Sequence, residues 1–292
     1  MVQGYFRMYR LGEGFAVLQT WLEREPNNTQ ALLFLGGLHA LRQRRAEAVE
    51  TYGRILELDP DHSMARLRLA MILLDENKPA EALTHLHYLQ EHQGNGNPTK
   101  PMILVLVARC LDQLGQEEQG EQLREEVLAQ YPHFGPALGD RGRWALRQGR
   151  WIDAETWLRE ALALEPTNRE LRYQLSQCLF KNGKNTEAES ELQRLRQIES
   201  DLVRLETITN HELLQRPGDP VLHLELGRLL LRQGQSEEGL HWLHRVLQAN
   251  PTNVYAHQVL ADYYQQVGDS SRAAYHRRFW ANTSSGQGTP AP

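Results

Sequence analysis

Proline recurs in this chain at a fixed spacing of 34 residues. Pro26 and Pro60 form one pair at this spacing, and Pro132 and Pro166 form another. Each proline closes a similar segment, such as Leu-Glu-Leu-Asp before Pro60 and Leu-Ala-Leu-Glu before Pro166. A self-similarity of this period indicates stacked helical hairpins. The chain is therefore predicted to form one elongated solenoid, in which each hairpin buries its apolar face against its neighbours.

Small residues recur at two further positions of the repeat. Counting the first residue of each unit as position 1, the units start at Thr29, Ser63, Pro101, Gly135, Arg169, Pro220 and Val254. Position 8 holds Gly36, Ala70, Ala108, Gly142, Ser176, Gly227 and Ala261, and position 20 holds Ala48, Ala82, Gly120, Ala154, Ala188, Gly239 and Ala273. Apolar residues at i, i+3, i+4 and i+7 predict two amphipathic helices in each unit. The small residues indicate that these helices cross closely. The turn between them is expected to adopt positive φ at Asn77, Gly115, Gly149, Gly183, Gly234 and Gly268.

With these residues the chain resembles the tetratricopeptide repeat family. The match is clear at Leu35-Gly36, Ala48, Tyr52 and Pro60, and it extends over residues 29 to about 280. The resemblance implies an all-α fold, a right-handed superhelical solenoid whose concave groove binds a protein or peptide. Position 4 departs from the family, because Arg66, Arg172, His223 and His257 replace the usual large apolar residue. Local packing at these four residues is therefore an open question.

One interval between successive units is 17 residues longer than the repeat. The extra residues lie between Asn185 and Arg216, a stretch without glycine or proline. Because helices in this fold alternate in direction, we expect one lengthened helix over about 186–214, kinked near Thr207-Ile208-Thr209-Asn210, which are poor helix formers. Its Leu195, Ile198, Leu202 and Leu205 follow the spacing of a coiled-coil seam. We favour packing of this seam on the next repeat, and a homodimer contact stays open as the alternative.

These observations divide the chain into five parts. We expect a partial leading repeat over 1–28, five repeats over 29–199 and a helix extension over 200–219. Two repeats with a polar C-terminal cap follow over 220–281, and a disordered tail over 282–292.

Composition argues against several classes of function. A net charge of −5 and a pI of about 6.2 give no overall basic field for nucleic acid. Cys110 and Cys178 lack CxxC spacing, and His241 and His244 lack a further metal ligand nearby. No stretch approaches the ~18 apolar residues of a membrane span. We therefore predict no catalytic residues, no cofactor and no metal. The start of the chain lacks the apolar core of a secretory signal, which favours the cytoplasm; the periplasm stays open if the chain is a fragment.

The resemblance implies that the first helix of each unit lines the groove. In the early units this surface is apolar and contains methionine, which suits an amphipathic helix or peptide. In the later units it carries a row of arginines, which bind carboxylates as bidentate forks. The candidate groove residues are Leu33, Leu67, Arg68, Met71, Met102, Val105, Arg109, Arg143, Arg147, Tyr173, Gln177, Arg228 and Arg232. The alternative is that the apolar residues pack against neighbouring helices and the arginines pair with nearby acids.

Three hypotheses of function follow. The first is a non-catalytic scaffold or adaptor that binds a peptide or amphipathic helix in the groove, and the sequence does not identify this partner. The second is a structural spacer or oligomerisation segment of a longer polypeptide, which would use the long helix. The third is an enzyme, because some solenoids of this kind assist group transfer onto proteins, but no set of residues supports it. The clamp that family members use for chaperone C-termini is not expected, since Leu33, Gly37, Arg68, Met102 and Leu106 occupy its positions.

Overall fold

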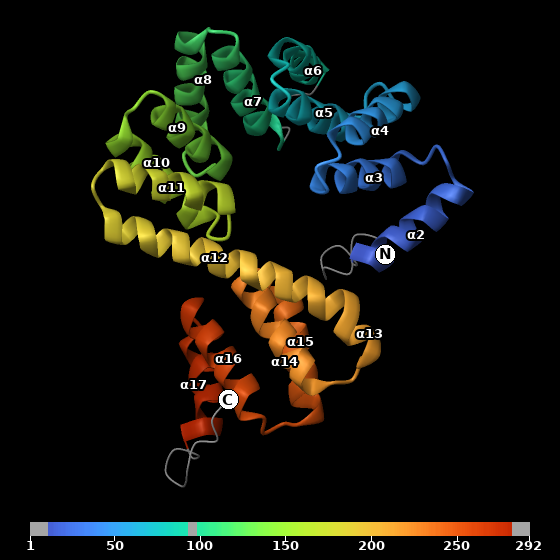
Figure 1. The fold of residues 1–292 in the computed structure, drawn as a ribbon, viewed down its shortest axis with the longest axis vertical. Coiled ribbons are helices and arrows are strands. Elements are labelled where there is room, and N and C mark those ends of the chain that lie inside the picture. The colour runs from blue at the N-terminus through green and yellow to red at the C-terminus, as the bar shows by residue number, and fades with distance from the viewer. Residues whose placement is uncertain (1–10, 93–97, 282–292) are drawn as a thin grey trace. The chain divides into compact units, whose positions relative to one another are not determined.

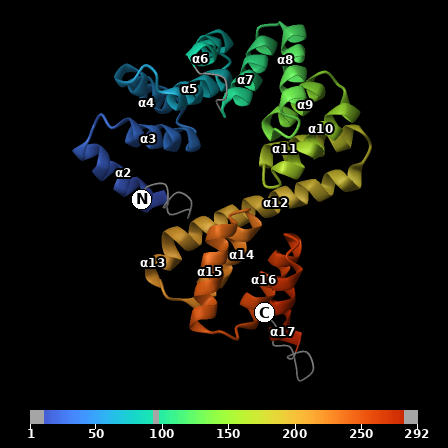
Figure 2. The same cartoon turned by 180° about the vertical axis from the view of Figure 1, so that it is seen from behind.

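The computed structural model describes residues 11–92 and 98–281, and this part of the chain is helical without a strand. Two kinds of helix alternate along it (Figures 1 and 2). The first helices of the hairpins, called A helices, are α3 (Thr29–Leu41), α5 (Ser63–Asp75), α7 (Lys100–Gln113), α9 (Gly135–Arg147), α11 (Arg169–Lys181), α14 (Pro220–Arg232) and α16 (Val254–Gln266). The second helices, called B helices, are α2 (Leu11–Arg24), α4 (Arg45–Leu58), α6 (Pro79–His92), α8 (Glu117–Gln130), α10 (Trp151–Leu164), α12 (Asn185–Thr207), α15 (Ser236–Ala249) and α17 (Ser270–Ala281). The A helices begin at or within one residue of the predicted unit starts, which confirms the all-α fold of stacked hairpins.

A polar side chain two residues after a proline starts several A helices. Asn28, Asn168 and Asn253 each accept a hydrogen bond from the backbone N–H three residues on. Such a cap satisfies one of the N–H groups that have no partner within the first turn of a helix. The proline stops the B helix and the cap starts the next A helix, so the closing segment of each repeat fixes the direction of the chain.

Close crossing of the A and B helices explains the small residues at position 8. A Cβ atom added at Gly36 would lie 2.6 Å from the ring of Tyr52, and one added at Gly142 would lie 2.7 Å from Leu158. The turn between the two helices has positive φ at every predicted position, for example 70° at Gly149 and 58° at Asn77. Gln43 (φ 59°) fills the same place in the first unit, where the sequence pattern had indicated no residue.

The described helices group into two compact units, Phe15–Leu195 and the part that begins at Arg196. The sequence predicted one elongated solenoid, and the boundary between the two units falls within α12. In the Phe15–Leu195 unit, each of α5, α7 and α9 contacts the next A helix of the chain. The A helices α5, α7, α9 and α11 thus form one continuous layer.

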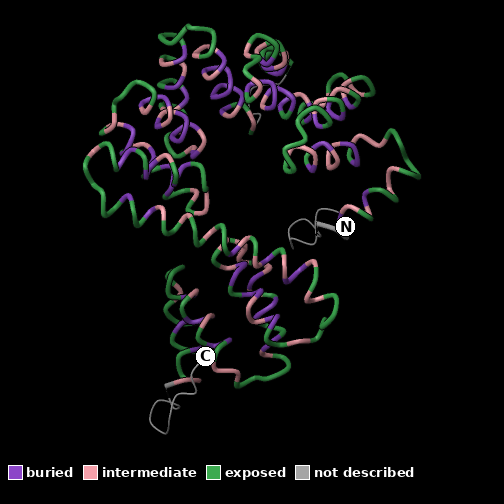
Figure 3. Tube along the Cα trace, viewed as in Figure 1, coloured by how far each residue is buried: buried purple, intermediate pink, exposed green. Residues whose placement is uncertain are grey.

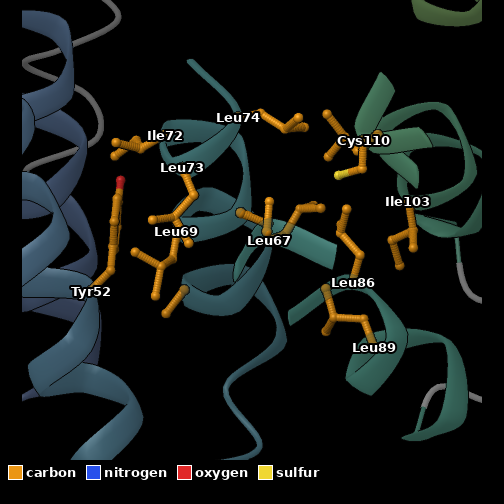
Figure 4. Packing of buried hydrophobic residues seen from close by; sticks show 14 of the residues in the cluster. Tyr52, Leu67, Leu69, Ile72, Leu73, Leu74, Leu86, Leu89, Ile103 and Cys110 are labelled. Atoms are coloured by element: carbon orange, nitrogen blue, oxygen red, sulfur yellow. The ribbon is translucent and has the colours of Figure 1, made fainter. Parts of the chain in front are cut away.

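Aliphatic side chains fill the core of the early hairpins. The buried cluster between α3 and α7 contains Tyr52, Leu73, Leu86 and Ile103, and Figure 4 shows them packed between the helices. Figure 3 shows that buried and exposed residues alternate along most helices, as the amphipathic pattern predicts, whereas six consecutive residues of α7, 103–108, are buried.

The long helix is continuous but contains a π segment. α12 runs to Thr207 and leads into the π segment η1 (Ile208–Glu212), and then into the short α13 (Leu213–Gln215). The irregularity therefore lies where the sequence predicted a kink. Leu202 and Leu205 of the predicted seam pack in a cluster with Leu226 of α14 and Trp242 of α15. Leu202 and Leu205 therefore pack on the next repeat, as we favoured, and not in a dimer contact.

The polar residues at position 4 are accommodated by a recurring arrangement that we call the position-4 clasp. Each of the four side chains reaches back to the backbone carbonyl of the proline six residues earlier, as Arg66 does to Pro60 and His223 to Pro217 (2.8 Å). Each also meets the residue nineteen positions later on its B helix. Arg172 forms an ion pair with Glu191, and the ring of His223 lies 4.8 Å from that of Trp242.

In the last hairpin the position-4 clasp is made of two histidines. His257 donates from Nε2 to the carbonyl oxygen of Pro251 (2.9 Å), so its Nδ1 is the acceptor for His276 Nδ1, 2.7 Å away. Both rings are buried, and His257 stacks on Phe279 at 3.7 Å. The departures at position 4 therefore preserve local packing, because each polar group finds a partner in its own hairpin or in the turn before it.

Candidate functional site

A network of charged residues links four successive A helices of the Phe15–Leu195 unit. At its centre lies Arg124 of α8, a B-helix residue with only 2% of its side chain exposed. Two carboxylates flank it, Asp112 near the end of α7 and Asp140 in α9. We call Arg124, Asp112 and Asp140 the buried triad.

The guanidinium of Arg124 bridges the two carboxylates of the buried triad. Its Nε donates to Asp140 at 2.8 Å, and one Nη donates to Asp112. The ring of Trp144 lies 5.5 Å from the guanidinium carbon. Arg124 therefore holds α7, α8 and α9 together by charge where the neighbouring hairpins use aliphatic contacts.

Three arginines of the predicted row attach to the triad from its exposed side. Arg147 donates to Asp112 at 2.7 Å, and Arg143 and Arg109 lie 3.5 and 3.9 Å from Asp140. We call Arg109, Arg143 and Arg147 the surface arginines. They are 27%, 26% and 53% exposed, so each guanidinium contacts solvent while a buried carboxylate holds one side of it.

Two further acids reach the surface arginines from the rim. Asp75 of α5 lies 3.6 Å from Arg109, and Glu170 of α11 lies 3.4 Å from Arg143. Both acids are more than half exposed, so these are surface ion pairs, which contribute little to stability. The alternative in which the arginines pair with nearby acids is correct for part of each guanidinium, and the exposed part stays free to contact a ligand.

Correlated changes in the repeat pattern make room for the buried triad. Position 24 holds Arg124 where sister units have Tyr52 or Leu158, and position 20 holds glycine where most units have alanine. A Cβ atom at Gly120 would lie 2.5 Å from Asp112 Oδ1. The glycine thus opens the space that the carboxylate occupies.

Burial opposes the ionised form of the triad. Desolvation raises the pKa of Asp112, and hydrogen bonding to the Arg124 guanidinium works against that rise. Asp112 Oδ1 and Arg124 Nη1 are buried without a hydrogen-bond partner. A buried ion pair is often no more stable than apolar residues of similar volume. The triad is therefore not expected to stabilise the fold more than apolar side chains at these three positions would.

The structure places the apolar groove residues differently from the sequence prediction. Leu67 and Val105 are buried, at 7% and 3% exposure, and Figure 4 shows Leu67 inside the aliphatic cluster. Leu33, Met71 and Met102 are partly buried against the same cluster. The prediction of an open apolar groove is corrected for Leu67 and Val105, because the close contacts between successive A helices turn these side chains into the core.

The remaining predicted residues differ in their surroundings. Arg68, Tyr173 and Gln177 are exposed on A helices of the Phe15–Leu195 unit. Arg228 and Arg232 belong to the other unit, where Arg228 is exposed and Arg232 pairs with Asp201 of α12. The predicted row of arginines is therefore divided between the two units. The residue that sequence reasoning missed is Arg124, although an arginine at an otherwise apolar repeat position was a visible signal.

Other kinds of site find no support in the described part of the chain. Residues 11–92 and 98–281 contain no group of three or more His, Cys, Asp or Glu placed to hold a metal. Within the same residues, no helix is both long enough and apolar enough to cross a membrane. Cys110 and Cys178 are free and buried, and burial raises the pKa of the Cys178 thiol to about 11.

Models of the tetratricopeptide repeat match this chain at residues 10–62, 37–98 and 145–205, which together cover about half of it. Human protein O-mannosyl-transferase TMTC1 is 26% identical over 148 residues, which is 51% of this chain and 15% of that protein. The chain therefore spans only a small part of the length of this curated relative.

Several solved structures share the fold. PilW, a widely conserved type IV pilus biogenesis factor, has a TM-score of 0.53 at 21% identity, over 66% of this chain and 89% of its own. A thermophilic TPR protein of Thermus thermophilus has a TM-score of 0.51 at 22% identity, over 70% of this chain and 100% of its own. At identities this low the likeness concerns the fold alone.

Proposed function

Because the chain belongs to the tetratricopeptide repeat family, whose members bind protein partners, we propose that it is a non-catalytic scaffold that holds a peptide segment of its partner across the A helices of the Phe15–Leu195 unit. The whole-protein activity of the transferase relative is not part of this proposal, since the match covers so little of that protein.

The observation that carries the proposal is a run of exposed polar and aromatic residues on consecutive A helices. Arg147 of α9 and Tyr173 of α11 are half exposed, and Gln177 follows Tyr173 by one helical turn. Arginine and tyrosine are enriched at protein interfaces, where they combine large contact area with hydrogen bonding. The A helices α5, α7, α9 and α11 contact one another in sequence, so exposed residues on them lie along one continuous layer that an extended segment can follow.

The spacer hypothesis has less support. Its dimer contact requires the seam of α12, yet Leu205 is fully buried within its own unit and Leu202 packs beside it. Val203 is the exposed apolar residue on this part of α12, at 65%. Substituting Val203 by glutamate therefore tests self-association without opening the core, which a charge at Leu202 would do.

The test of the scaffold is peptide selection with three versions of the protein. A displayed library of random peptides is panned against the wild type, an A-helix variant (Arg147→Ala, Tyr173→Ala, Gln177→Ala) and a B-helix control (Ile152→Ala, Thr156→Ala, Arg159→Ala). All six positions are exposed, so both variants are expected to fold, which circular dichroism checks. We expect peptides that bind the wild type and the control but not the A-helix variant. Equal recovery by all three proteins would refute binding on this face.

A further inference from the structure

We propose that the partner segment is acidic, and that buried Arg124 is a positioning residue that fixes the surface arginines as carboxylate-binding forks. This inference rests on the proposed scaffold function and names the chemistry of its partner. It concerns Arg109, Arg143 and Arg147 in the Phe15–Leu195 unit.

Without its two rim acids, the charged network has a positive surplus. Arg124 and the three surface arginines bring four positive charges, while the buried carboxylates Asp112 and Asp140 bring two negative charges. Two positive charges remain. The rim acids Asp75 and Glu170 balance these two charges, at 3.6 and 3.4 Å and from positions more than half exposed. A carboxylate from a partner would compete only with these weak surface pairs.

The surface arginines also have hydrogen-bond donors to spare. A guanidinium carries five N–H donors in a planar fork. Arg147 uses one Nη for its 2.7 Å bond to Asp112, and the contacts of Arg143 are 3.4 and 3.5 Å long. Arg109 approaches its two acids only at 3.6 and 3.9 Å. These contacts are long for Arg109 and Arg143, so a partner's carboxylate that displaces a rim acid can form two parallel hydrogen bonds with the guanidinium.

The buried triad explains how these forks are held. A free arginine side chain loses up to about 2 kcal/mol of rotamer entropy when a ligand immobilises it. Here Asp112 and Asp140 already anchor the guanidinium groups, and Arg124 anchors both carboxylates from below. Preorganised donors bind more tightly because this ordering precedes the ligand. Stability alone does not account for a charged triad at positions where sister units have Leu74, Leu86 and Leu106.

A peptide fits these charges better than a nucleic acid does. The surface arginines alternate with acids from α5, α7, α9 and α11, which would repel a continuous row of phosphates. The net charge of −5 acts in the same direction. Separated carboxylates on a peptide, by contrast, can each meet one fork.

The first experiment measures charge preference. The probe is a short fluorescein-labelled peptide of alternating Glu and Leu, and its matched control carries Gln in place of every Glu. Fluorescence anisotropy is expected to show at least about tenfold tighter binding of the Glu peptide, with an affinity that falls as salt rises. Arg143→Gln with Arg147→Gln should remove this preference, whereas Arg159→Gln on α10 should keep it. Equal affinity of the wild type for both peptides overturns the proposal.

The second experiment isolates the role of Arg124. The sister-residue variant Asp112→Leu, Arg124→Leu, Asp140→Leu keeps the three surface arginines but removes their anchors. We expect its Tm to match or exceed that of the wild type, while the ratio of Glu-peptide to Gln-peptide affinity falls toward one. If the triple variant does not fold, Arg124→Lys takes its place. It keeps the charge but loses the planar guanidinium, so the ratio of Glu-peptide to Gln-peptide affinity should also fall. An unchanged ratio in a folded variant overturns the positioning role.

The two proposals fail in different ways. If the selected peptides depend on the A helices but are not enriched in Asp and Glu, the scaffold stands and the acidic partner is wrong. If no peptide depends on the A helices, the scaffold itself is wrong. Preferential binding of fluorescein-labelled single-stranded RNA over the Glu peptide would overturn the acidic-peptide proposal in favour of a phosphate ligand.

Discussion

Two regions of this molecule bury polar groups where some of its sister repeats bury apolar ones, and they do so with different chemistry. Between α7 and α9, Arg124 is charged at every physiological pH and lies between two carboxylates. Between α16 and α17, the rings of His257 and His276 hydrogen-bond to each other, and His257 also contacts the backbone carbonyl of Pro251. The first region needs countercharges on neighbouring helices, and the second is satisfied within a hairpin and the turn before it.

The difference shows what each kind of polar core can be used for. A buried guanidinium ties three helices together and orients charges at the surface, so any change to one member affects the others. A buried imidazole pair stacks on Phe279 and packs like an aromatic cluster near neutral pH. It is sensitive to acid, because burial and the neighbouring histidines lower the pKa of His276. The predictions below test this contrast.

The largest effect is expected from Arg124→Leu alone. This change leaves the buried carboxylates Asp112 and Asp140 without the positive charge of Arg124. Removing one partner of a buried ion pair typically lowers the free energy of unfolding by about 3–5 kcal/mol. Urea unfolding at pH 7 measures the loss. A loss below about 1 kcal/mol would mean that water already reaches the two carboxylates.

Replacing all three members of the triad should reverse most of that loss. Asp112→Leu and Asp140→Leu added to Arg124→Leu remove the unpaired charges, and apolar replacement of a buried ionic cluster is often neutral or stabilising by about 1–4 kcal/mol. The comparison of the single and triple variants in the same unfolding experiment isolates the cost of unpaired charge. A triple variant as unstable as Arg124→Leu would show that the defect is one of packing.

The histidine pair should make the last hairpin sensitive to acid. Burial, with His257 and His244 nearby, lowers the pKa of His276 from 6.5 to about 4. The unfolded chain therefore binds a proton more readily, and the stabilisation present at neutral pH is lost as the pH falls from about 6.5 toward 4.

We expect a loss of about 1–2 kcal/mol between pH 7 and pH 5 from this residue. Hydrogen exchange of α16 and α17 at the two pH values measures it locally. His276→Phe keeps the ring and removes the titration, so it should flatten the dependence in this hairpin. An identical pH response of the variant would assign the effect to other groups.

The smallest effect is expected from a surface ion pair. Arg150 lies 2.8 Å from Asp153, and both side chains are nearly half exposed. Arg150→Gln should change the free energy of unfolding by about 0–1 kcal/mol. A loss comparable to that of Arg124→Leu would mean that burial does not distinguish the two arginines.

The sequence predicts the fold well because the repeat imposes the same local constraint seven times. The small residues at Gly36 and Gly142, the turns at positive φ and the starts of the A helices all follow from side-chain size and backbone freedom. These properties belong to the residue itself, so they can be read without knowing its neighbours. The division into two compact units could not be predicted in this way, since the boundary between Leu195 and Arg196 falls within one helix.

The candidate site was only partly predictable for the same reason. Arg109, Arg143 and Arg147 follow from repeat positions. Their acids come mostly from other helices, since Asp140 alone shares α9 with Arg143. Leu67 and Val105 show the opposite failure, because a position that lines a groove in an average repeat is covered here by close neighbouring A helices. The domain limits 29–199 and 220–281 and the binding role of each groove residue stay predictions.

The position-4 clasp has a consequence for anyone who wishes to build new proteins from these hairpins. Three of the clasps join a side chain of one repeat to the carbonyl of the proline that closes the repeat before it, at Pro60, Pro166 and Pro251. A transplanted fragment that starts after the proline would lose the carbonyl that the position-4 side chain contacts. The exchangeable module of this chain begins at the closing proline itself, and it should be transplanted together with the B-helix residue nineteen positions beyond position 4.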